Sequence, residues 1–438
     1  MAVAAQILLV GKGDVRGRTG PAPDTSDIRA GQGILLSVPL GTLTSRVRRQ
    51  GGPAVKLRVD RDAFAEAVAW TARALPARPA VPVLAGMRLE VFADGASLHL
   101  SGFDYEVSAR ASVEVDAEET GSALVPGRLI AEIVRNLPEG TVYLESEGSK
   151  LFVTGGTARF TLITMPLEEY PTLPKMPDRI GSVPADTLGQ AVRQVTPAAS
   201  RDDTLPMLTG AYMDFAGDTL SVVATDRYRI AVRELWWRPD DPALEVAALV
   251  PARTLSDTVR GLLSRTNVEI ALSTQSVGEG VRLAPGEGMI GFENGERRTT
   301  TRLIDSDFVK YASWFPSEFT SRAEVAVSPL VEAVKRVALV ADRHTPLRLA
   351  LAEGEVVLEA GSGEDAQAVE AIEIAYEGDP LRVAFRTDYL IDGLSAVETD
   401  TAHLNFTEPT KPAVFTEVPE QEGDKPAFRY LVQPLRVS

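Results

Sequence analysis

Short apolar stripes at helical spacing recur along the chain, each flanked by strands in which apolar and polar residues alternate. The stripes follow an i, i+3, i+4 pattern and superpose as Phe64/Ala67/Val68, Leu188/Ala191/Val192 and Leu330/Ala333/Val334. A strand such as KLRVD precedes each stripe, and capping-type or proline residues head the helices at Asp62, Pro184 to Asp186, and Ser328-Pro329. Alternating strands bounded by Gly and Asp turns follow. The pattern predicts three copies of one strand–helix–strand unit.

Each unit has a second half built on the same plan. VPG at 125–127 opens RLIAEIVRNL, VPA at 250–252 opens RTLSDTVRGLL, and FRT at 385–387 opens DYLIDGLSAV. More alternating strands follow each of these predicted helices. We therefore expect three similar modules, which we place at 55–180, 181–322 and 323–438.

Residues 1–54 differ from the rest of the chain. They are rich in Gly, Pro and Arg and show no sustained period, so we expect a mostly disordered extension. Periodic sequence begins at Val55. An alternative that stays open is that translation starts at this residue. The opening MAVAAQILLV has no basic start and no small-residue cleavage site, so it is not interpreted as a signal peptide.

The pattern of one helix and a few antiparallel strands per half-module predicts an α+β fold in two layers, helix on sheet. If the modules join edge to edge, the sheets lie outside and the helices inside. Closing such an arrangement into a ring would also leave no exposed edge strand, which is otherwise a site of aggregation.

Charge is unevenly distributed along the chain. The 438 residues carry 45 Lys and Arg against 61 Asp and Glu, a net charge of −16, which repels phosphate on average. Basic residues nevertheless recur at non-core positions of the predicted helices: Arg73, Arg128, Arg135, Arg193, Arg253, Arg260, Lys335 and Arg336. Scattered arginines on helices usually form a solvated face. The equal spacing of Arg128/Arg135 and Arg253/Arg260 favours a lining for DNA instead.

Several chemistries are excluded or disfavoured by residue content. The chain has no cysteine, which excludes disulfides, thiolate catalysis and Cys-ligated metals and fits a reducing cytoplasm. His99, His344 and His403 lie far apart and form no ligand pattern. No apolar run is long enough to span a bilayer. We expect a cytoplasmic protein without metal, cofactor or membrane partner.

Two sequence features resemble catalytic motifs. The run from Gly286 to Gly291 matches GxGxxG, but strand-like FENGERRTTTRL follows in place of the helix that would hold a pyrophosphate. Asp104 in GFDYE and Asp226 in ATDRYR occupy matching positions, which predicts a repeated turn and not a metal pair. No nucleophile elbow occurs, so we expect no catalytic residue. An enzyme using these features is the first rival interpretation.

Larger motifs, taken together, resemble one family. They are VKLRVDRDAF, RPAVPVLAGMRLEV, VPGRLIAEIVRNLPEG, ARFTLITMPLEEYP, VVATDRYRIAV, VPARTLSDTVRGL and the terminal YLVQPLRV. From Val55 onward the chain resembles the bacterial beta sliding clamp, the processivity subunit of DNA polymerase III. The resemblance implies a head-to-tail homodimer of six similar domains that encircles duplex DNA without reading its sequence.

The resemblance also assigns roles to single residues. Arg78 is expected to approach DNA, and Arg128, Arg135, Arg253 and Arg260 to line the channel. Phe160 corresponds to the aromatic residue of the dimer interface, and Leu339 with Val340 to the apolar pair that receives it. Two such head-to-tail contacts would close the ring.

The family's partner-peptide cleft corresponds to Leu208, Thr225, Arg227, Tyr228, Arg229, Ile230, Val309, Trp314, Leu431, Gln433, Leu435 and Arg436. The replicative polymerase subunit, the clamp loader, repair polymerases, mismatch-repair proteins and ligase are the partners implied. Many members have Gly in place of Arg227, Pro in place of Val309 and an apolar residue in place of Gln433, and Trp314 is bulkier than the usual aliphatic. A divergent second copy of the clamp, inhibitor-resistant or specialised, therefore stays open, as does a repeat scaffold with no DNA role.

Overall fold

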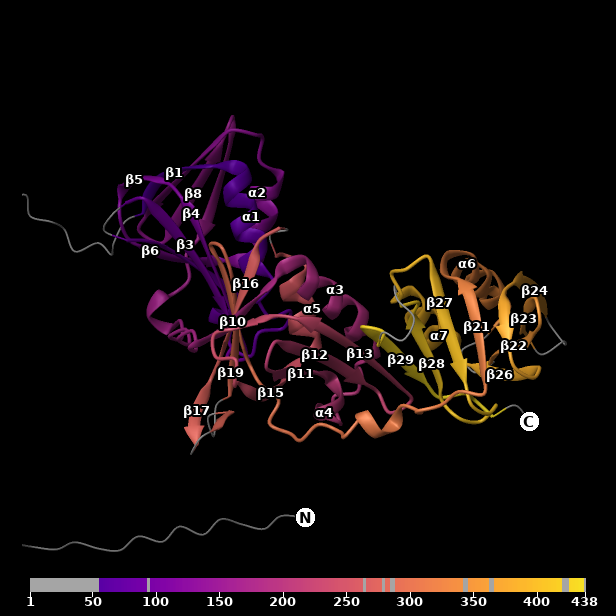
Figure 1. The fold of residues 1–438 in the computed structure, drawn as a ribbon. Helices are drawn as coiled ribbons and strands as arrows, with labels where there is room; N and C mark the ends of the chain where they lie inside the picture. The colour runs from indigo at the N-terminus through magenta and orange to yellow at the C-terminus, as the bar shows by residue number, and fades with distance from the viewer. Residues whose placement is uncertain are drawn as a thin grey trace, which may run out of the picture. The chain divides into compact units, whose positions relative to one another are not determined.

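The computed structural model describes residues 55–92, 95–262, 265–277, 280–283, 288–341, 346–361, 366–419 and 425–436. The predicted extension at 1–54 lies outside the described residues. Within them, short helices alternate with antiparallel strands, as the periodicities predict. Figure 1 shows the longer helices in pairs, α1 with α2, α3 with α5, and α6 with α7, each pair beside its own strands.

The first module contains two α-helices, α1 (Arg61–Ala72) and α2 (Gly127–Asn136), and the short turns η1 (Pro82–Ala85) and η2 (Leu167–Glu169). Its strands are β1 (Lys56–Asp60), β2 (Gly86–Val91), β3 (Ser97–Phe103), β4 (Val107–Glu114), β5 (Asp116–Glu119), β6 (Ser122–Pro126), β7 (Thr141–Glu147), β8 (Lys150–Gly155) and β9 (Ala158–Ile163). One sheet has the order β5-β1-β7-β8-β9, and the run β4-β3-β2-β6 belongs to a longer sheet.

The second module repeats this plan with α3 (Ala185–Val195), η3 (Thr196–Ala198), α4 (Pro206–Thr209), α5 (Ala252–Val259) and η4 (Ala312–Trp314). Its strands are β10 (Arg179–Pro184), β11 (Gly210–Ala216), β12 (Thr219–Thr225), β13 (Arg229–Trp236), β14 (Arg238–Pro239), β15 (Glu245–Pro251), β16 (Asn267–Leu272), β17 (Thr274–Val277), β18 (Gly280–Leu283), β19 (Met289–Asn294) and β20 (Arg297–Arg302). A strand, β19, follows Gly288, as predicted for the GxGxxG match. Gly286 and Glu287 of that match lie outside the described residues.

The third module contains α6 (Val327–Val337), η5 (Ala338–Val340) and α7 (Thr387–Ser395). Its strands are β21 (Ser321–Ala326), β22 (Leu347–Ala352), β23 (Glu355–Ala360), β24 (Ala368–Glu373), β25 (Ala375–Glu377), β26 (Leu381–Phe385), β27 (Thr401–Phe406), β28 (Ala413–Glu417) and β29 (Phe428–Val432). The strands β10 and β21 each begin two residues before the module limits that we expected from the sequence.

The sheets continue from one module into the next. β4 pairs antiparallel with β20, so that nine strands run in the order β14-β10-β16-β19-β20-β4-β3-β2-β6. β13 pairs antiparallel with β29 in a second nine-stranded sheet, β15-β11-β12-β13-β29-β28-β27-β21-β25. Both junctions follow one rule: the third strand after a module's first helix pairs with the last strand of the next module.

The predicted helix stripes are buried. Phe64, Leu188 and Leu330 are almost completely inaccessible, and they lie within the two main apolar cores. One core fills the first module, and the other is continuous through the second and third. The helices therefore cover one face of the sheets, which confirms the two-layer prediction.

The prediction of the first helix cap was wrong. The side chain of Asp60, and not that of Asp62, accepts hydrogen bonds from the backbone amides of Asp62 and Ala63, both at 3.0 Å. The reason is that β1 runs directly into α1, so the last strand residue is the one whose carboxylate reaches the free amides. Pro184 and Ala326 precede α3 and α6 without a side-chain cap.

Candidate functional site

A tight turn between β12 and β13 organises the predicted cleft. The carboxylate of Asp226 accepts hydrogen bonds from the amides of Tyr228 and Arg229 at 3.1 and 3.2 Å. Asp104 makes the same contacts in the first module, with Glu106 and Val107 at 3.0 and 2.6 Å. The predicted repeated turn is therefore confirmed.

The turn holds Arg227 at φ 83°, in the left-handed region that favours glycine. Tyr105 occupies the matching position of the first module at φ 76°. The backbone amide of Arg227 donates to the hydroxyl of Thr225 at 3.2 Å, while the side chain of Arg227 is exposed. A glycine at this position would relieve backbone strain, but it would also remove a cation from the rim of the predicted cleft.

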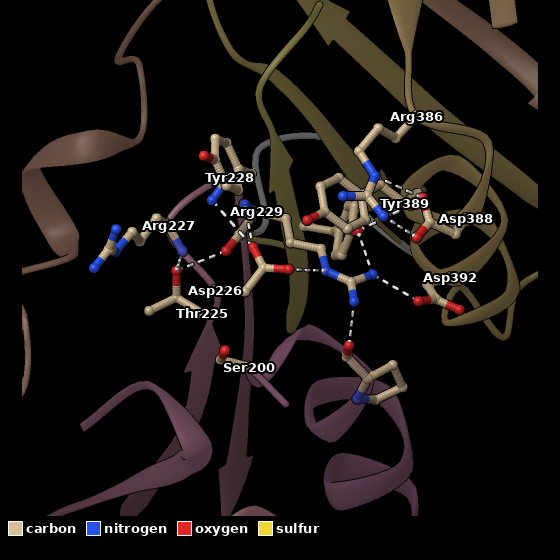
Figure 2. Close-up of polar contacts among 12 residues, drawn as sticks. Ser200, Thr225, Asp226, Arg227, Tyr228, Arg229, Arg386, Asp388, Tyr389 and Asp392 are labelled. Carbon is tan, nitrogen blue, oxygen red and sulfur yellow. Dashed lines mark hydrogen bonds and ion pairs between the residues drawn. The ribbon is translucent and has the colours of Figure 1, made fainter. Parts of the chain in front are cut away.

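Arg229 lies at the centre of the junction between the second and third modules (Figure 2). Its side chain is only 8% exposed and forms ion pairs with Asp226 at 3.0 Å and with Asp392 of α7 at 2.6 Å. It also donates to the carbonyl of Pro197 and, at 3.3 Å, to the hydroxyl of Tyr430. Arg229 is thus saturated by contacts inside the protein.

An aromatic ring completes this cluster. The guanidinium groups of Arg229 and Arg386 both lie 4.3 Å from the ring centre of Tyr389. Burial alone would lower the pKa of Arg229, but its contacts with Tyr430, Asp392 and Asp226 raise it above its ordinary value. Arg229 therefore stays charged and joins α7 and β29 of the third module to the turn of the second.

The predicted cleft residues divide into a buried floor and an exposed rim. Leu208, Thr225, Ile230 and Leu431 are buried. Ile230 lies opposite Leu431 in the β13–β29 pairing. The rim residues are exposed: Arg227, Tyr228, Trp314, Gln433, Leu435 and Arg436.

A hydrogen bond and a recess connect parts of the rim. The amide of Gln433 donates to the carbonyl of Tyr228 at 2.8 Å, so the C-terminal strand is fixed to the turn. A recess of about 500 Å³ is lined by Thr410, Lys411, Gln433, Pro434, Leu435 and Arg436. Apolar side chains of Pro434 and Leu435 border it beside the cations Lys411 and Arg436.

Val309 lies apart from this recess. It lines a larger hollow of about 1310 Å³ together with Tyr212, Phe308 and Tyr311, where the connecting segment crosses the sheet. The rings of Tyr212 and Phe308 stack there at 4.8 Å. The predicted cleft residues are therefore not grouped as expected, because Val309 and Leu435 line two different recesses.

The predicted DNA-contacting residues are exposed on or beside the helices, and several are already engaged within the chain. Arg78 is exposed between α1 and η1, and Arg135, Arg193 and Arg253 have no ion-pair partner among the described residues. Arg128 donates to the carbonyl of Leu75 at 3.0 Å. Acidic partners bind three of the others: Arg260 pairs with Asp257, Lys335 with Glu332, and Arg336 with Glu370.

Arg73 lies at the junction of the first and second modules. Arg73 and Arg297 flank the buried ring of Trp70, at 5.5 and 5.7 Å from its centre. Partial burial of the guanidinium against Trp70, followed by repulsion from Arg297, lowers the pKa of Arg73, although the residue as a whole is exposed. A recess of about 330 Å³ beside them is lined by Arg73, Arg128 and Arg253, together with Asp104 and Asp257. The structure thus brings together three of the predicted cations, which come from two modules.

The predicted dimer residues lie on exposed surface. Phe160 projects from β9, and Leu339 on η5 is 84% exposed. Val340 is half-buried and packs against the core that extends through the third module. Both β9 and β24, the strand to which Arg336 is joined through Glu370, are sheet edges.

Sequence reasoning missed the partners of the buried arginine. Asp392, Tyr389 and Arg386 all come from α7 or the residue before it, more than 150 positions from Arg229. Each looks like an ordinary helix residue in the sequence. Only pairing information between distant positions could have revealed them.

Family models match the chain in three consecutive parts. The N-terminal, central and C-terminal domain models of the DNA polymerase III beta subunit match residues 55–174, 182–310 and 312–428. The chain belongs to the DNA polymerase III beta subunit family. A beta sliding clamp of Streptomyces coelicolor is 52% identical over 386 residues, which cover 88% of this chain and 100% of the relative. A beta sliding clamp homolog, GriR, of Streptomyces muensis is 41% identical and covers 87% of this chain and 99% of its own.

Solved structures of the DNA polymerase III beta subunit family have the same fold. The sliding clamp of Pseudomonas aeruginosa bound to griselimycin superposes with a TM-score of 0.77 at 26% identity, covering 88% of this chain and 100% of that one. The clamp of Bacillus subtilis superposes with a TM-score of 0.76 at 24% identity over the same shares, which shows the fold alone.

Membership of this family establishes the biochemical role. The chain is a non-catalytic processivity subunit of DNA polymerase III, a DNA sliding clamp with three domains. The described residues contain no cluster of three potential metal-ligating side chains. None of their helices is long and apolar enough to cross a membrane.

Proposed function

We propose that two copies of the chain close head to tail into a ring around duplex DNA, through pairing of β9 of one copy with β24 of the other. The support is topological. The third strand after the first helix is β4, β13 or β24, and the last strand of a module is β9, β20 or β29. Within the chain, β4 pairs with β20 and β13 with β29. The same rule leaves β24 and β9 as the unused pair.

The two edges also suit each other chemically. β9 carries Arg159 and the exposed Phe160, whereas β24 carries Glu370 and Glu373. Leu339 offers an exposed apolar side chain on η5, which directly follows α6, the helix that contacts β24. An exposed edge strand invites pairing, and pairing two different edges gives a head-to-tail contact that two copies close.

The role of the basic helix residues follows from this closure. Arg73, Arg78, Arg128, Arg135, Arg193, Arg253, Arg260, Lys335 and Arg336 would face phosphates without reading bases, an attraction that weakens steeply with salt. Retention then comes from linking the ring to the duplex. A polymerase bound to the ring gains a high effective concentration at the primer end.

The buried floor and exposed rim around Tyr228, Gln433 and Leu435 are the proposed cleft for partner peptides. Apolar side chains beside backbone groups and cations suit short apolar segments. We place there the polymerase catalytic subunit, the clamp loader, repair polymerases, mismatch-repair proteins and ligase. The proposal keeps three modules, expected at 55–180, 181–322 and 323–438, with the second and third beginning at the strands β10 (Arg179) and β21 (Ser321). It also includes a cytoplasmic location, because the absence of cysteine fits a reducing compartment.

The test combines solution mass with retention on DNA. The full chain is expected to sediment with twice its monomer mass of 47.0 kDa. After loading on nicked circular DNA it should stay bound in high salt and leave once the DNA is linearised. Leu339→Asp should give monomers that are not retained, whereas Leu129→Asp, an exposed leucine on α2, should keep the dimer mass. A monomeric wild-type chain, or equal loss from circular and linear DNA, would refute the ring.

A further inference from the structure

A polar recess lies on the sheet face that points away from the helices, at the junction of the first and second modules. Its volume is about 350 Å³. It is lined by residues of β2, β3, β4, β19 and β20, by Leu173, and by Gly295 and Glu296 of the turn between β19 and β20. On the same strands Leu89, Leu100 and Ala111 point into the core around Phe64. The recess is therefore separated from the helix layer by the sheet itself.

Three arginines meet in one row across this face. The strand register places Arg88 opposite Ser101, Ser101 opposite Arg110, and Arg110 opposite Arg298. Arg110 belongs to the first module and Arg298 to the second, so the row crosses the junction. Like charges directly opposite each other on neighbouring strands are destabilising.

Two of the three arginines have acidic partners and the middle one has none. Arg88 pairs with Glu90 at 2.6 Å, and Arg298 pairs with Glu293 at 2.8 Å. The side chain of Arg110 has no hydrogen bond or ion pair with another described residue, although its backbone lies in the strand ladders. Burial first, then repulsion from Arg298 and Arg88, lowers the pKa of Arg110.

A second unsatisfied donor lies beside it. The Nε atom of Arg88 is fully buried and has no hydrogen-bond partner among the described residues. A buried polar group without a partner is costly, and a charged one more so. Three carboxylates, of Glu90, Glu293 and Glu296, also line the recess, and two of them are paired with Arg88 and Arg298. The guanidinium of Arg110 is therefore the cation in the recess whose side chain has no hydrogen-bond or ion-pair partner among the described residues.

Oxyanions match this arrangement. Guanidinium groups bind phosphate and carboxylate oxygens through short, charge-assisted hydrogen bonds. A phosphate group can present oxygens to Arg110, Arg298 and Ser101 at once, because these residues stand in one row on adjacent strands. The exposed ring of Phe92, packed edge-on against His99 at 4.8 Å, forms an apolar wall beside the row.

We propose that this outer recess binds a phosphate group, held by Arg110 and Arg298 from the two sides of the junction. The phosphate is either inorganic or carried by a nucleotide whose base contacts Phe92. Because the sheet separates the recess from the helices, the proposal is independent of DNA in the channel. A bound phosphate would offset the repulsion between the two strands and tighten the junction between the first two modules.

The test is thermal unfolding of the full chain with inorganic phosphate, against chloride at equal ionic strength. Phosphate should raise the melting temperature saturably. Arg110→Gln and Arg298→Gln should each weaken phosphate binding by about tenfold or more, the worth of a charge-assisted hydrogen bond. Arg382→Gln, an exposed strand arginine on β26, should keep the full response.

Without phosphate, Arg110→Gln should melt at or above the temperature of the wild type, because it removes the like-charge contact. A second arm with adenosine monophosphate, against adenosine as control, separates the two sources of phosphate. If adenosine monophosphate binds more tightly than inorganic phosphate and Phe92→Ala abolishes this difference, the recess is a nucleotide site. If the two ligands bind equally, the ligand is inorganic phosphate. The proposal would be overturned if phosphate raised the melting temperature of the wild type and of both glutamine variants equally. It would also be overturned if Arg110→Gln melted below the wild type without phosphate.

Discussion

The two junctions between modules use the same strand pairing, but their arginine side chains have different contacts. At the second junction, Arg229 is buried and contacts two carboxylates, a carbonyl and a hydroxyl. At the first, Arg297 pairs with the exposed carboxylate of Glu66 at 2.7 Å and flanks Trp70 together with Arg73. Arg110 stands opposite Arg298 there, and its side chain has no acidic partner among the described residues. Backbone pairing therefore sets the geometry, while side chains decide how firmly each junction is held and what else it can bind.

The largest effect is expected at the buried arginine. Arg229→Met leaves Asp226 and Asp392 without their cation, and breaking a buried pair costs about 3–5 kcal/mol. Chemical unfolding measures the loss. Binding of an apolar partner peptide should weaken as well, since the turn that carries Tyr228 loses its anchor.

The matched control at the other junction is Arg73→Gln, because Arg73 is exposed and contacts a ring and one backbone carbonyl. It should cost about 1 kcal/mol or less. Equal losses from both substitutions would contradict the contrast between the junctions.

An intermediate effect is expected from Gly261, which packs against Trp70. A Cβ atom at this position would lie 2.5 Å from the ring of Trp70 and 2.0 Å from Nη1 of Arg73. Arg73 can move, but the buried ring cannot, so Gly261→Ala should destabilise by about 1–3 kcal/mol. Gly189→Ala in α3, whose Cβ would meet only the flexible end of Arg193, should be neutral or stabilising. Thermal unfolding of the two variants checks this: the melting temperature should fall for Gly261→Ala and should not fall for Gly189→Ala.

The smallest effect concerns acid. Burial raises the pKa of Asp388, but its hydrogen bond and charge contact with Arg386 outweigh this and hold it below its ordinary value of 3.8. A depressed carboxyl pKa contributes stability above the unfolded value, which is lost as the pH falls through the folded one. Asp388→Asn should therefore lower the melting temperature slightly at pH 6, and the difference from wild type should shrink as the pH falls below 3.8. The side chain is half exposed, so the difference is small, and Asp305→Asn serves as the control. A loss that stays the same throughout an acid titration would rule out this charge contact as its cause.

Much of the fold could be predicted from the sequence, because helix stripes and strand alternation are local signals. The stripes at Phe64, Leu188 and Leu330 are buried as expected, and the Asp104 and Asp226 turns hold their own backbones. The cap of α1 was misplaced, since a carboxylate at either Asp60 or Asp62 looks equally suitable in sequence. The family resemblance suggested the cleft residues, but their division into floor and rim depends on packing.

Features that join distant residues could not be predicted. The pairing of Arg229 with Asp392 and the row from Arg88 to Arg298 exist only because strands from different modules adopt one register. No spacing in the sequence encodes that register. The sequence likewise showed the basic helix residues but not that Arg336 and Lys335 already have acidic neighbours.

Two nine-stranded sheets that run unbroken through both junctions leave the chain without an internal hinge at those places. Separating the modules within one copy would break five residue pairs of the strand ladder at either junction and, between the second and third modules, a shared apolar core as well. In a closed ring, the interface between the two copies would then be the place that opens to admit a duplex, because no covalent bond joins the chains there. Because each copy is rigid at its internal junctions, a force that opens the ring would separate the two copies at this interface.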